Sequence, residues 1–198
     1  LVSPSNPTGQ CLTSAQMKFV SQLAEDKNLV VISDEIYREI HYTPEKPSSI
    51  CQFTDRAVIL SGMSKMASMT GWRLGWAYGP HDVIEKATIM HQYTSTCASA
   101  LVQRAALKIF TKPGRESVEQ QRKTLEENCD WICSWIDREL GQFYVRPQGA
   151  FYLMLSIHDL KRNSLSTSLE LLKERVVTIP GAAFGSQGEG FLRLSFAS

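Results

Sequence analysis

The stretch from Gly62 to Gly75 contains a lysine, Lys65, and eight positions later an arginine, Arg73, among glycines and hydroxyl side chains. The lysine follows an apolar run that is typical of a buried strand, where a charged side chain is unusual. A lysine amine can form a Schiff base with an aldehyde. Arginine and small hydroxyl side chains suit a phosphate group. The segment therefore indicates a site for a phosphorylated aldehyde.

Three other short motifs carry polar side chains that could serve the same site. They are Asn6-Pro-Thr-Gly9, Asp34-Glu-Ile-Tyr37 and the C-terminal stretch around Arg193. Each motif taken singly has a plainer interpretation, as a turn, a helix cap and an exposed strand charge respectively. Asp34 is more specific, because it ends an apolar run and ligands bind beyond the carboxyl ends of strands in open α/β sheets.

The elements that must position these side chains are predicted from hydrophobic periodicity. Residues 12–28 have the pattern of an amphipathic helix, with Thr13 as N-cap and Gln16 completing a capping box. Short apolar runs rich in β-branched residues predict strands over 29–32, 57–60 and 74–78. Strands alternating with helices favour an α/β fold with a mostly parallel sheet.

The second half of the chain has a different pattern, in which helices dominate. Helices are predicted over 82–91 and 98–110, and a break in the helical pattern over 112–114. One long helix follows over 115–140 and ends at Gly141. Beyond it, strands are predicted over 143–145 and 151–155, a helix over 168–174, and strands over 176–179 and 191–196. We therefore expect part of a large domain over residues 1–114, a connecting helix over 115–140, and a small α+β domain over 141–198 that is truncated at its end.

Composition excludes several classes of function. The 198 residues are 43% hydrophobic, so we expect a globular chain. A net charge of +1 offers no basic surface for nucleic acid or anionic lipid, and no apolar run suits a membrane span. The four histidines are scattered, so no metal site is predicted. The chain starts at Leu1 in what has the pattern of a strand end, so we expect a fragment of a longer protein.

The chain has five cysteines, at positions 11, 51, 97, 129 and 133. This odd number without dense spacing predicts a reducing, cytoplasmic location. Cys129 and Cys133 are four residues apart on the predicted long helix, so they share a face and are expected to be small buried thiols.

In this order along the chain, the four motifs resemble the class-I aminotransferases, the PLP-dependent enzymes of the aspartate aminotransferase superfamily (fold type I). The lysine segment matches the PLP-attachment signature of that family at every specified position across fourteen residues. The resemblance covers essentially the whole chain, and it implies the C-terminal half of a subunit.

The resemblance implies a role for each polar side chain around pyridoxal 5'-phosphate. Lys65 would form the Schiff base and then carry a proton from the substrate α-carbon to C4′. Asp34 would pair with the pyridine nitrogen and keep it protonated. Ile36, on an extended segment, would pack against one ring face. Tyr37 and Asn6 would donate to the 3′ oxygen, and a cis Asn6–Pro7 peptide would aim Asn6.

The phosphate and the substrate would be held by the remaining polar residues. The resemblance implies that Arg73 clamps the phosphate. Ser64 would be a second donor, but many relatives have a serine where this chain has Gly62, so Ser61 is an alternative. Arg193 would bind the substrate α-carboxylate through a bidentate fork, which lysine lacks. No counterpart is evident of the arginine that binds a distal carboxylate in aspartate-specific relatives.

Other parts of such a site lie upstream of Asn6 in relatives. These are an aromatic residue stacked on the second ring face, a glycine-containing phosphate loop, and a tyrosine from the other subunit of a homodimer. The leading hypothesis is ping-pong transamination between an L-amino acid and a 2-oxo acid by the parent subunit. The 198-residue chain alone is expected to be inactive.

Two alternatives remain open on sequence. The same scaffold supports carbon–sulfur lyases and related synthases, although the lyase branch often has histidine at the position of Tyr37. The chain could also be a catalytically incompetent fragment or scaffold. The intact Lys65, Asp34, Arg73 and Arg193 argue against decay of the parent protein.

Overall fold

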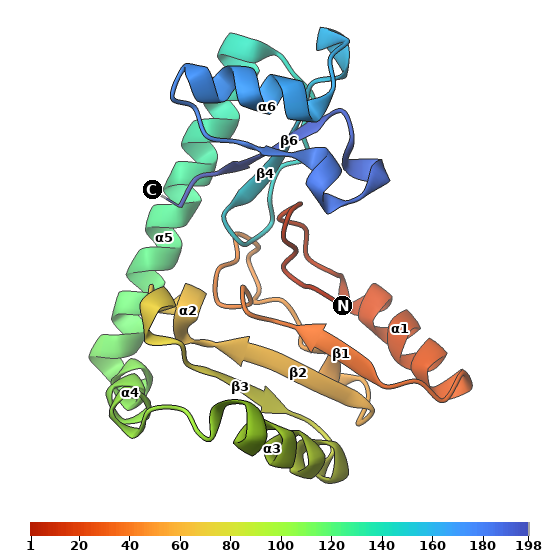
Figure 1. Cartoon of the computed structure of the whole chain (residues 1–198), viewed down its shortest axis with the longest axis vertical. Coiled ribbons are helices and arrows are strands. Elements are labelled where there is room, and N and C mark those ends of the chain that lie inside the picture. Colours follow the sequence, from red (N-terminus) through yellow and green to blue (C-terminus); the bar gives the residue numbers. More distant parts are fainter. Residues whose placement is uncertain (198) are drawn as a thin grey trace.

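The computed structural model describes residues 1–197. It has two β-sheets, one above the other along the long axis, and a long helix, α5, that runs beside both (Figure 1). The lower sheet belongs to the N-terminal part of the chain and the upper sheet to the C-terminal part. The expected α/β unit followed by a smaller α+β unit is therefore present.

The lower sheet contains β1 (Val31–Asp34), β2 (Ala57–Gly62) and β3 (Gly75–Tyr78) in that order. β1 and β2 are parallel, as predicted, but β3 is antiparallel to β2. The connection from β2 to β3 holds only short helical turns, and an antiparallel neighbour does not need the crossover helix that a parallel one requires. Gly62 is thus paired with Gly75, and the lysine segment forms the loop between them.

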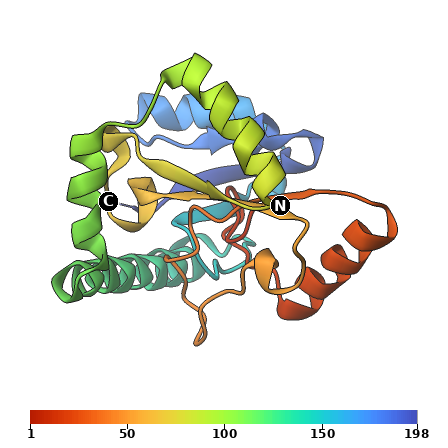
Figure 2. The same ribbon diagram turned by 90° about the horizontal axis from the view of Figure 1, so that it is seen from below.

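Helices lie on both sides of this sheet. Helix α1 (Ser14–Asp26) begins with the predicted Thr13–Gln16 capping box and packs Met17 and Ala24 into the core with Val31, Ala57 and Ile59. Helix α3 (His81–Ser95) lies on the other side, as Figure 2 shows. The short turns of the fold are α2 (Met63–Met66) and 3-10 segments at Ile50–Gln52, Thr70–Trp72, His158–Leu160, Gly181–Phe184 and Ser186–Gly188.

Helix α5 spans Lys112–Trp135 and continues as a π-helical turn over Ile136–Leu140. It follows α4 (Ala100–Ala106) and a 3-10 turn (Leu107–Phe110). The predicted break at 112–114 is wrong, because Pro113 lies in the first turn, where a missing N–H is tolerated. Thr111 caps this turn by accepting from the Gly114 amide. The C-terminal end at Gly141 is as predicted.

The upper sheet is antiparallel and has the strand order β4 (Tyr152–Ser156), β6 (Phe191–Ser195), β5 (Ile179–Pro180). Helix α6 (Ser164–Lys173) covers it, starting earlier than predicted because Asn163 caps its first turn. One face packs against α5 through buried Cys129, Cys133, Ile136, Leu153, Leu155 and Phe196. The predicted strand over 143–145 is reduced to a single bridge at Tyr144, and β5 is shorter than the predicted 176–179.

No helix in residues 1–197 combines the length and the apolar character that crossing a membrane requires.

Candidate active site

The turn after β1 presents three of the predicted site residues. Asp34 is the last residue of β1, and its Oδ1 accepts a hydrogen bond from the Ile36 amide at 3.0 Å. Residues 36–39 form a turn, so the expected extended path through Ile36 is wrong. The Ile36 side chain instead lies beside Gly62, at the start of the lysine segment.

Buried Glu35 fixes this turn to the next loop. Its carboxylate accepts from the Ser49 hydroxyl at 2.8 Å, the Ile50 amide at 3.2 Å and the Ser33 hydroxyl at 3.3 Å. Arg38 adds a cation at 3.7 Å. Because Glu35 lies between Asp34 and Tyr37 in sequence, these contacts set the positions of both.

Lys65 lies on the short helix α2, opposite α5. Its carbonyl oxygen accepts from Nε2 of Gln121 on α5 at 2.9 Å. Lys65 lines a cleft of about 360 Å³ between the two elements. Besides Lys65, the residues that line the cleft are Ser64, Ser68, Thr70, Gln120, Gln121, Thr124, Leu125, Phe151 and Ala197.

One continuous set of contacts links four residues: Tyr37, Tyr152, Arg193 and Asn6. The Tyr37 and Tyr152 hydroxyls are 3.1 Å apart. The Arg193 guanidinium lies 4.4 Å from the Tyr152 ring centroid and 5.0 Å from that of Phe184. Its Nη1 donates to Oδ1 of Asn6 at 2.8 Å. Burial raises the pKa of the Tyr37 phenol and the hydrogen bond with Tyr152 raises it further, whereas Arg193 lowers it.

The loop that carries Asn6 is pressed against the strand that carries Tyr152. The Gly9 carbonyl accepts from the Gln148 and Gly149 amides. Gly9 has φ +67°, and a Cβ there would lie 2.8 Å from the Tyr152 carbonyl oxygen, so only glycine suits this contact. The Asn6–Pro7 peptide is cis, as expected.

The predicted phosphate ligands lie apart from this set in the described part of the chain. Arg73 is exposed and its Nη1 donates to the Thr70 carbonyl at 2.9 Å. Ser64 shares the cleft of Lys65. Ser61 pairs with Trp76 across the sheet and lines a separate hollow beside α3.

The whole chain, residues 1–198, matches the family model for aminotransferase class I and II. The chain belongs to this family. A probable N-acetyl-LL-diaminopimelate aminotransferase of Bacillus subtilis is 37% identical over 98% of this chain and 49% of that protein. The aromatic-amino-acid aminotransferase 2 of Thermococcus litoralis is 35% identical over 99% of this chain and 51% of that protein.

Solved structures agree with this assignment. The aromatic aminotransferase of Pyrococcus horikoshii superimposes with a TM-score of 0.95 at 35% identity, covering all of this chain and 54% of that one. The aspartate aminotransferase of Thermus thermophilus with maleate gives a TM-score of 0.93 at 30% identity, with 52% of its chain covered. The chain has the fold of these type I aminotransferases, and it spans about half the length of the curated relatives it matches.

The donor set of this aminotransferase chain fits PLP. One Asp34 oxygen accepts the Ile36 amide, which leaves the other for a protonated ring nitrogen. Oδ1 of Asn6 accepts from Arg193, which leaves the amide Nδ2 free to donate toward a ring oxygen. Lys65 lines a cleft together with four hydroxyl residues, Ser64, Ser68, Thr70 and Thr124.

Sequence reasoning missed Tyr152 and Gln121, which connect the predicted residues. Tyr152 is half of a Phe-Tyr pair in a strand, a pattern typical of a plain core. Gln121 lies in a polar stretch of α5 and has no distinguishing neighbours in the sequence. Tyr152 gains its role only because β4 packs against the turn that carries Tyr37. Gln121 gains its role only because α5 packs against α2.

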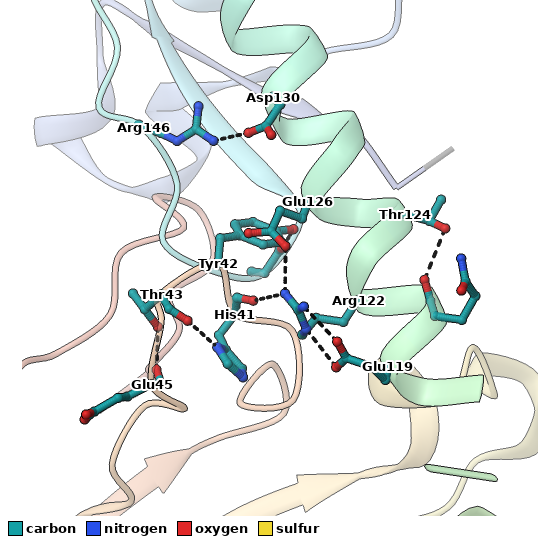
Figure 3. A network of polar contacts seen from close by, with 12 residues as sticks. His41, Tyr42, Thr43, Glu45, Glu119, Arg122, Thr124, Glu126, Asp130 and Arg146 are labelled. Carbon is teal, nitrogen blue, oxygen red and sulfur yellow. Dashed lines mark hydrogen bonds and ion pairs between the residues drawn. The ribbon is translucent and has the colours of Figure 1, made fainter. Parts of the chain in front are cut away.

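A polar network braces α5 against the loop that follows Tyr37 (Figure 3). Arg122 donates to the His41 carbonyl at 3.0 Å and pairs with Glu119 and Glu126. The Tyr42 hydroxyl in turn donates to the Ala150 carbonyl, next to β4. The hydrogen bond from Arg122 holds the pKa of Glu119 below its usual value. The network therefore ties α5 to the elements on either side of the site.

Proposed function

We propose that this chain forms the Lys65-bearing part of a PLP-dependent aminotransferase subunit. The reaction is transamination between an L-amino acid and a 2-oxo acid by a ping-pong route. The observation that carries the proposal is the contact set Tyr37–Tyr152–Arg193–Asn6, which adjoins the Lys65 cleft through Phe151. Phe151 lines that cleft and its ring packs edge-on against Tyr37 at 5.5 Å.

Each residue has a distinct task in this proposal. Lys65 would hold the cofactor through its aldehyde group, and its amine, once released by the amine of the substrate, would take the substrate α-proton at Nζ. The Asp34 carboxylate holds the ring nitrogen in its protonated form, and Tyr37 and Asn6 donate to the ring oxygen. The bound cofactor supplies an electron sink for the loss of the α-proton. Arg193 binds the substrate carboxylate through its planar fork.

The phosphate would be held by Arg73 with a serine. Ser64 is favoured over Ser61 because it lines the same cleft as Lys65, whereas Ser61 faces the hollow beside α3. Substituting each serine by alanine and measuring PLP affinity tests this choice. A larger loss for Ser61→Ala would contradict it.

The central experiment is borohydride reduction of the full-length protein after PLP is added. Peptide mass spectrometry is expected to find the reduced cofactor on Lys65, and Lys65→Ala is expected to remove it. Product formation should need an added 2-oxo acid as amino acceptor. If an oxo acid accumulates without an acceptor, the protein is a lyase of the same scaffold. If Lys65 is not labelled, the proposal is wrong.

The proposal assigns activity to a longer subunit, because the chain spans about half the length of its curated relatives. The chain alone is expected to be inactive, and normal turnover by it would contradict this expectation. We propose a cytoplasmic homodimer with the site at the subunit interface. The five free cysteines support a reducing setting, and gel filtration with light scattering tests the dimer.

The amino donor is best identified with a panel of amino acids and 2-oxo acids on the full-length protein. The relatives named above include enzymes for aromatic amino acids and for aspartate. Arg193 serves the α-carboxylate that all these donors share, so it does not discriminate between them.

A further inference from the structure

We propose that Tyr152 is a positioning residue with two roles. The hydroxyl of Tyr152 orients the phenol of Tyr37, which faces the cofactor. The ring of Tyr152 orients the guanidinium of Arg193, which binds the substrate. This inference rests on the proposed function. Tyr152 is 8% exposed and Tyr37 is 5% exposed, so neither hydroxyl has free access to solvent as a substitute partner. Buried hydroxyl groups need hydrogen-bond partners within the protein, and here each of the two hydroxyls is the partner of the other.

The hydroxyl end of Tyr152 sets the direction of the hydrogen bond. The two oxygens are 3.1 Å apart, and either could donate. If Tyr37 gives its proton to the ring oxygen of the cofactor, it cannot also give it to Tyr152. Tyr152 must then donate to the Tyr37 oxygen. Successive hydrogen bonds polarise one another, so this bond makes Tyr37 a stronger donor to the cofactor.

The ring of Tyr152 holds the guanidinium of Arg193. The two residues lie on adjacent antiparallel strands, where Arg193 is paired with Met154 and Tyr152 with Ser195. This register makes Tyr152 and Arg193 diagonal neighbours on one face of the sheet. The guanidinium is 4.4 Å from the Tyr152 centroid, within the range of a cation–π contact. Phe184 contacts the same guanidinium at 5.0 Å, so the plane of the fork is constrained by two rings.

Two charged groups act on the pKa of Tyr37: Asp34 at the end of β1 raises it and Arg193 on β6 lowers it. Both belong to the proposed site, so a change in Tyr37 alters the electrostatics of the cofactor. Tyr152 is the one side chain in the described contact set that touches both Tyr37 and Arg193. Its two functions are separable, because phenylalanine keeps the ring and removes only the hydroxyl.

The test uses Tyr152→Phe and Tyr152→Leu in the full-length PLP-loaded protein. The first readout is the pH midpoint of the visible absorbance band. The second readout is the Kd of maleate, an unreactive carboxylate. Tyr152→Phe is expected to move the midpoint to higher pH, by less than Tyr37→Phe does, and to leave the Kd within about twofold. Tyr152→Leu is expected to move the midpoint and also weaken maleate roughly three- to tenfold.

Tyr144→Phe is the matched control, because its hydroxyl contacts Asp137 at 3.1 Å, outside the proposed site. It should change neither readout. The inference is overturned if Tyr152→Phe leaves the midpoint unchanged, or if Tyr152→Phe weakens maleate as much as Tyr152→Leu. A wild-type protein without the visible band contradicts the proposed function itself. An unchanged midpoint with the band present contradicts only the role of Tyr152.

Discussion

Nη1 of Arg193 donates a 2.8 Å hydrogen bond to Oδ1 of Asn6, a residue 187 positions earlier in the chain. Asn6 lies on the loop beside the lower sheet and Arg193 on the central strand of the upper sheet. The bond therefore crosses the junction between the two sheets. It also fixes the orientation of the Asn6 amide, because an oxygen that accepts from Arg193 leaves the nitrogen available as a donor.

Arg193→Lys should weaken carboxylate binding strongly. A lysine keeps the charge but loses the planar fork, so one or more charge-assisted hydrogen bonds disappear. Such bonds are worth about 1.5–3 kcal/mol each, which predicts a Kd for maleate roughly tenfold to a hundredfold higher. Titration calorimetry on the full-length protein measures it. Arg162→Lys, at an exposed surface pair with Glu170, should leave the Kd unchanged.

Glu35→Ala should destabilise the fold. The side chain is 3% exposed and its loss leaves the Ser49 hydroxyl and the Ile50 amide without their buried acceptor. Uncompensated buried donors cost about 1–3 kcal/mol each, so we expect a loss of roughly 2–4 kcal/mol in the free energy of unfolding. Urea denaturation measures it. Glu39→Ala, which breaks a half-exposed pair with Lys46, should cost less than about 1 kcal/mol; equal losses would contradict the assignment.

Leu153→Ala tests the contact between the upper sheet and α5. Leu153 is fully buried against Cys129, Cys133 and Ile136. Truncation leaves a cavity, and such changes cost about 2–5 kcal/mol. Leu165→Ala on α6 is the control, because that side chain is 56% exposed. If both variants unfold at the same urea concentration, Leu153 does not carry the packing we assign to it.

Glu189 should make stability depend on pH in the acidic range. Its carboxylate accepts from the Ser164 amide at 2.7 Å, the Ser164 hydroxyl at 2.8 Å and the Gly190 amide at 3.1 Å. These bonds, led by the Ser164 amide, lower its pKa below the ordinary 4.5. A lowered folded-state pKa gives stability that is present above 4.5 and lost as the pH falls through the folded value.

The comparison of wild type with Glu189→Gln isolates this effect. The difference in unfolding free energy should be constant above about pH 5.5 and shrink on acidification below the ordinary carboxyl pKa. Urea titrations between about pH 3 and 7 measure it. A difference that grows on acidification would show that the sign is wrong.

Local signals predicted the elements well where a single mechanism dominates. The capping box at Thr13 and Gln16 placed the start of α1, and Gly141 placed the end of the long helix. The start of α5 was mispredicted because proline and glycine at 113 and 114 are breakers in most contexts. Here Thr111 caps the helix, so the same proline and glycine lie in its first turn instead of interrupting it.

The motifs single out the candidate residues, but they do not predict the contacts between them. These residues, namely Lys65, Asp34, Tyr37 and Arg193, stand out by motif, and Asp34 and Lys65 also stand out by their places at or just after the end of a strand. The turn through Ile36 was not predictable, because it depends on the Asp34 side chain accepting the Ile36 amide. Tyr152 was missed because an aromatic in a strand is ordinarily core, and its partners lie on other elements.

Helix α5 holds a backbone carbonyl on each side of the site. Gln121 binds the Lys65 carbonyl, and Asn128, seven residues later, binds the Phe196 carbonyl just beyond the strand of Arg193. Seven residues are almost two turns, so both side chains lie on nearly the same face, about 10.5 Å apart along the axis. The helix thus fixes the distance between the segment that carries Lys65 and the strand that carries Arg193. A one-residue insertion between 121 and 128 would move Asn128 about 1.5 Å further along the helix axis and rotate it by about 100° around that axis.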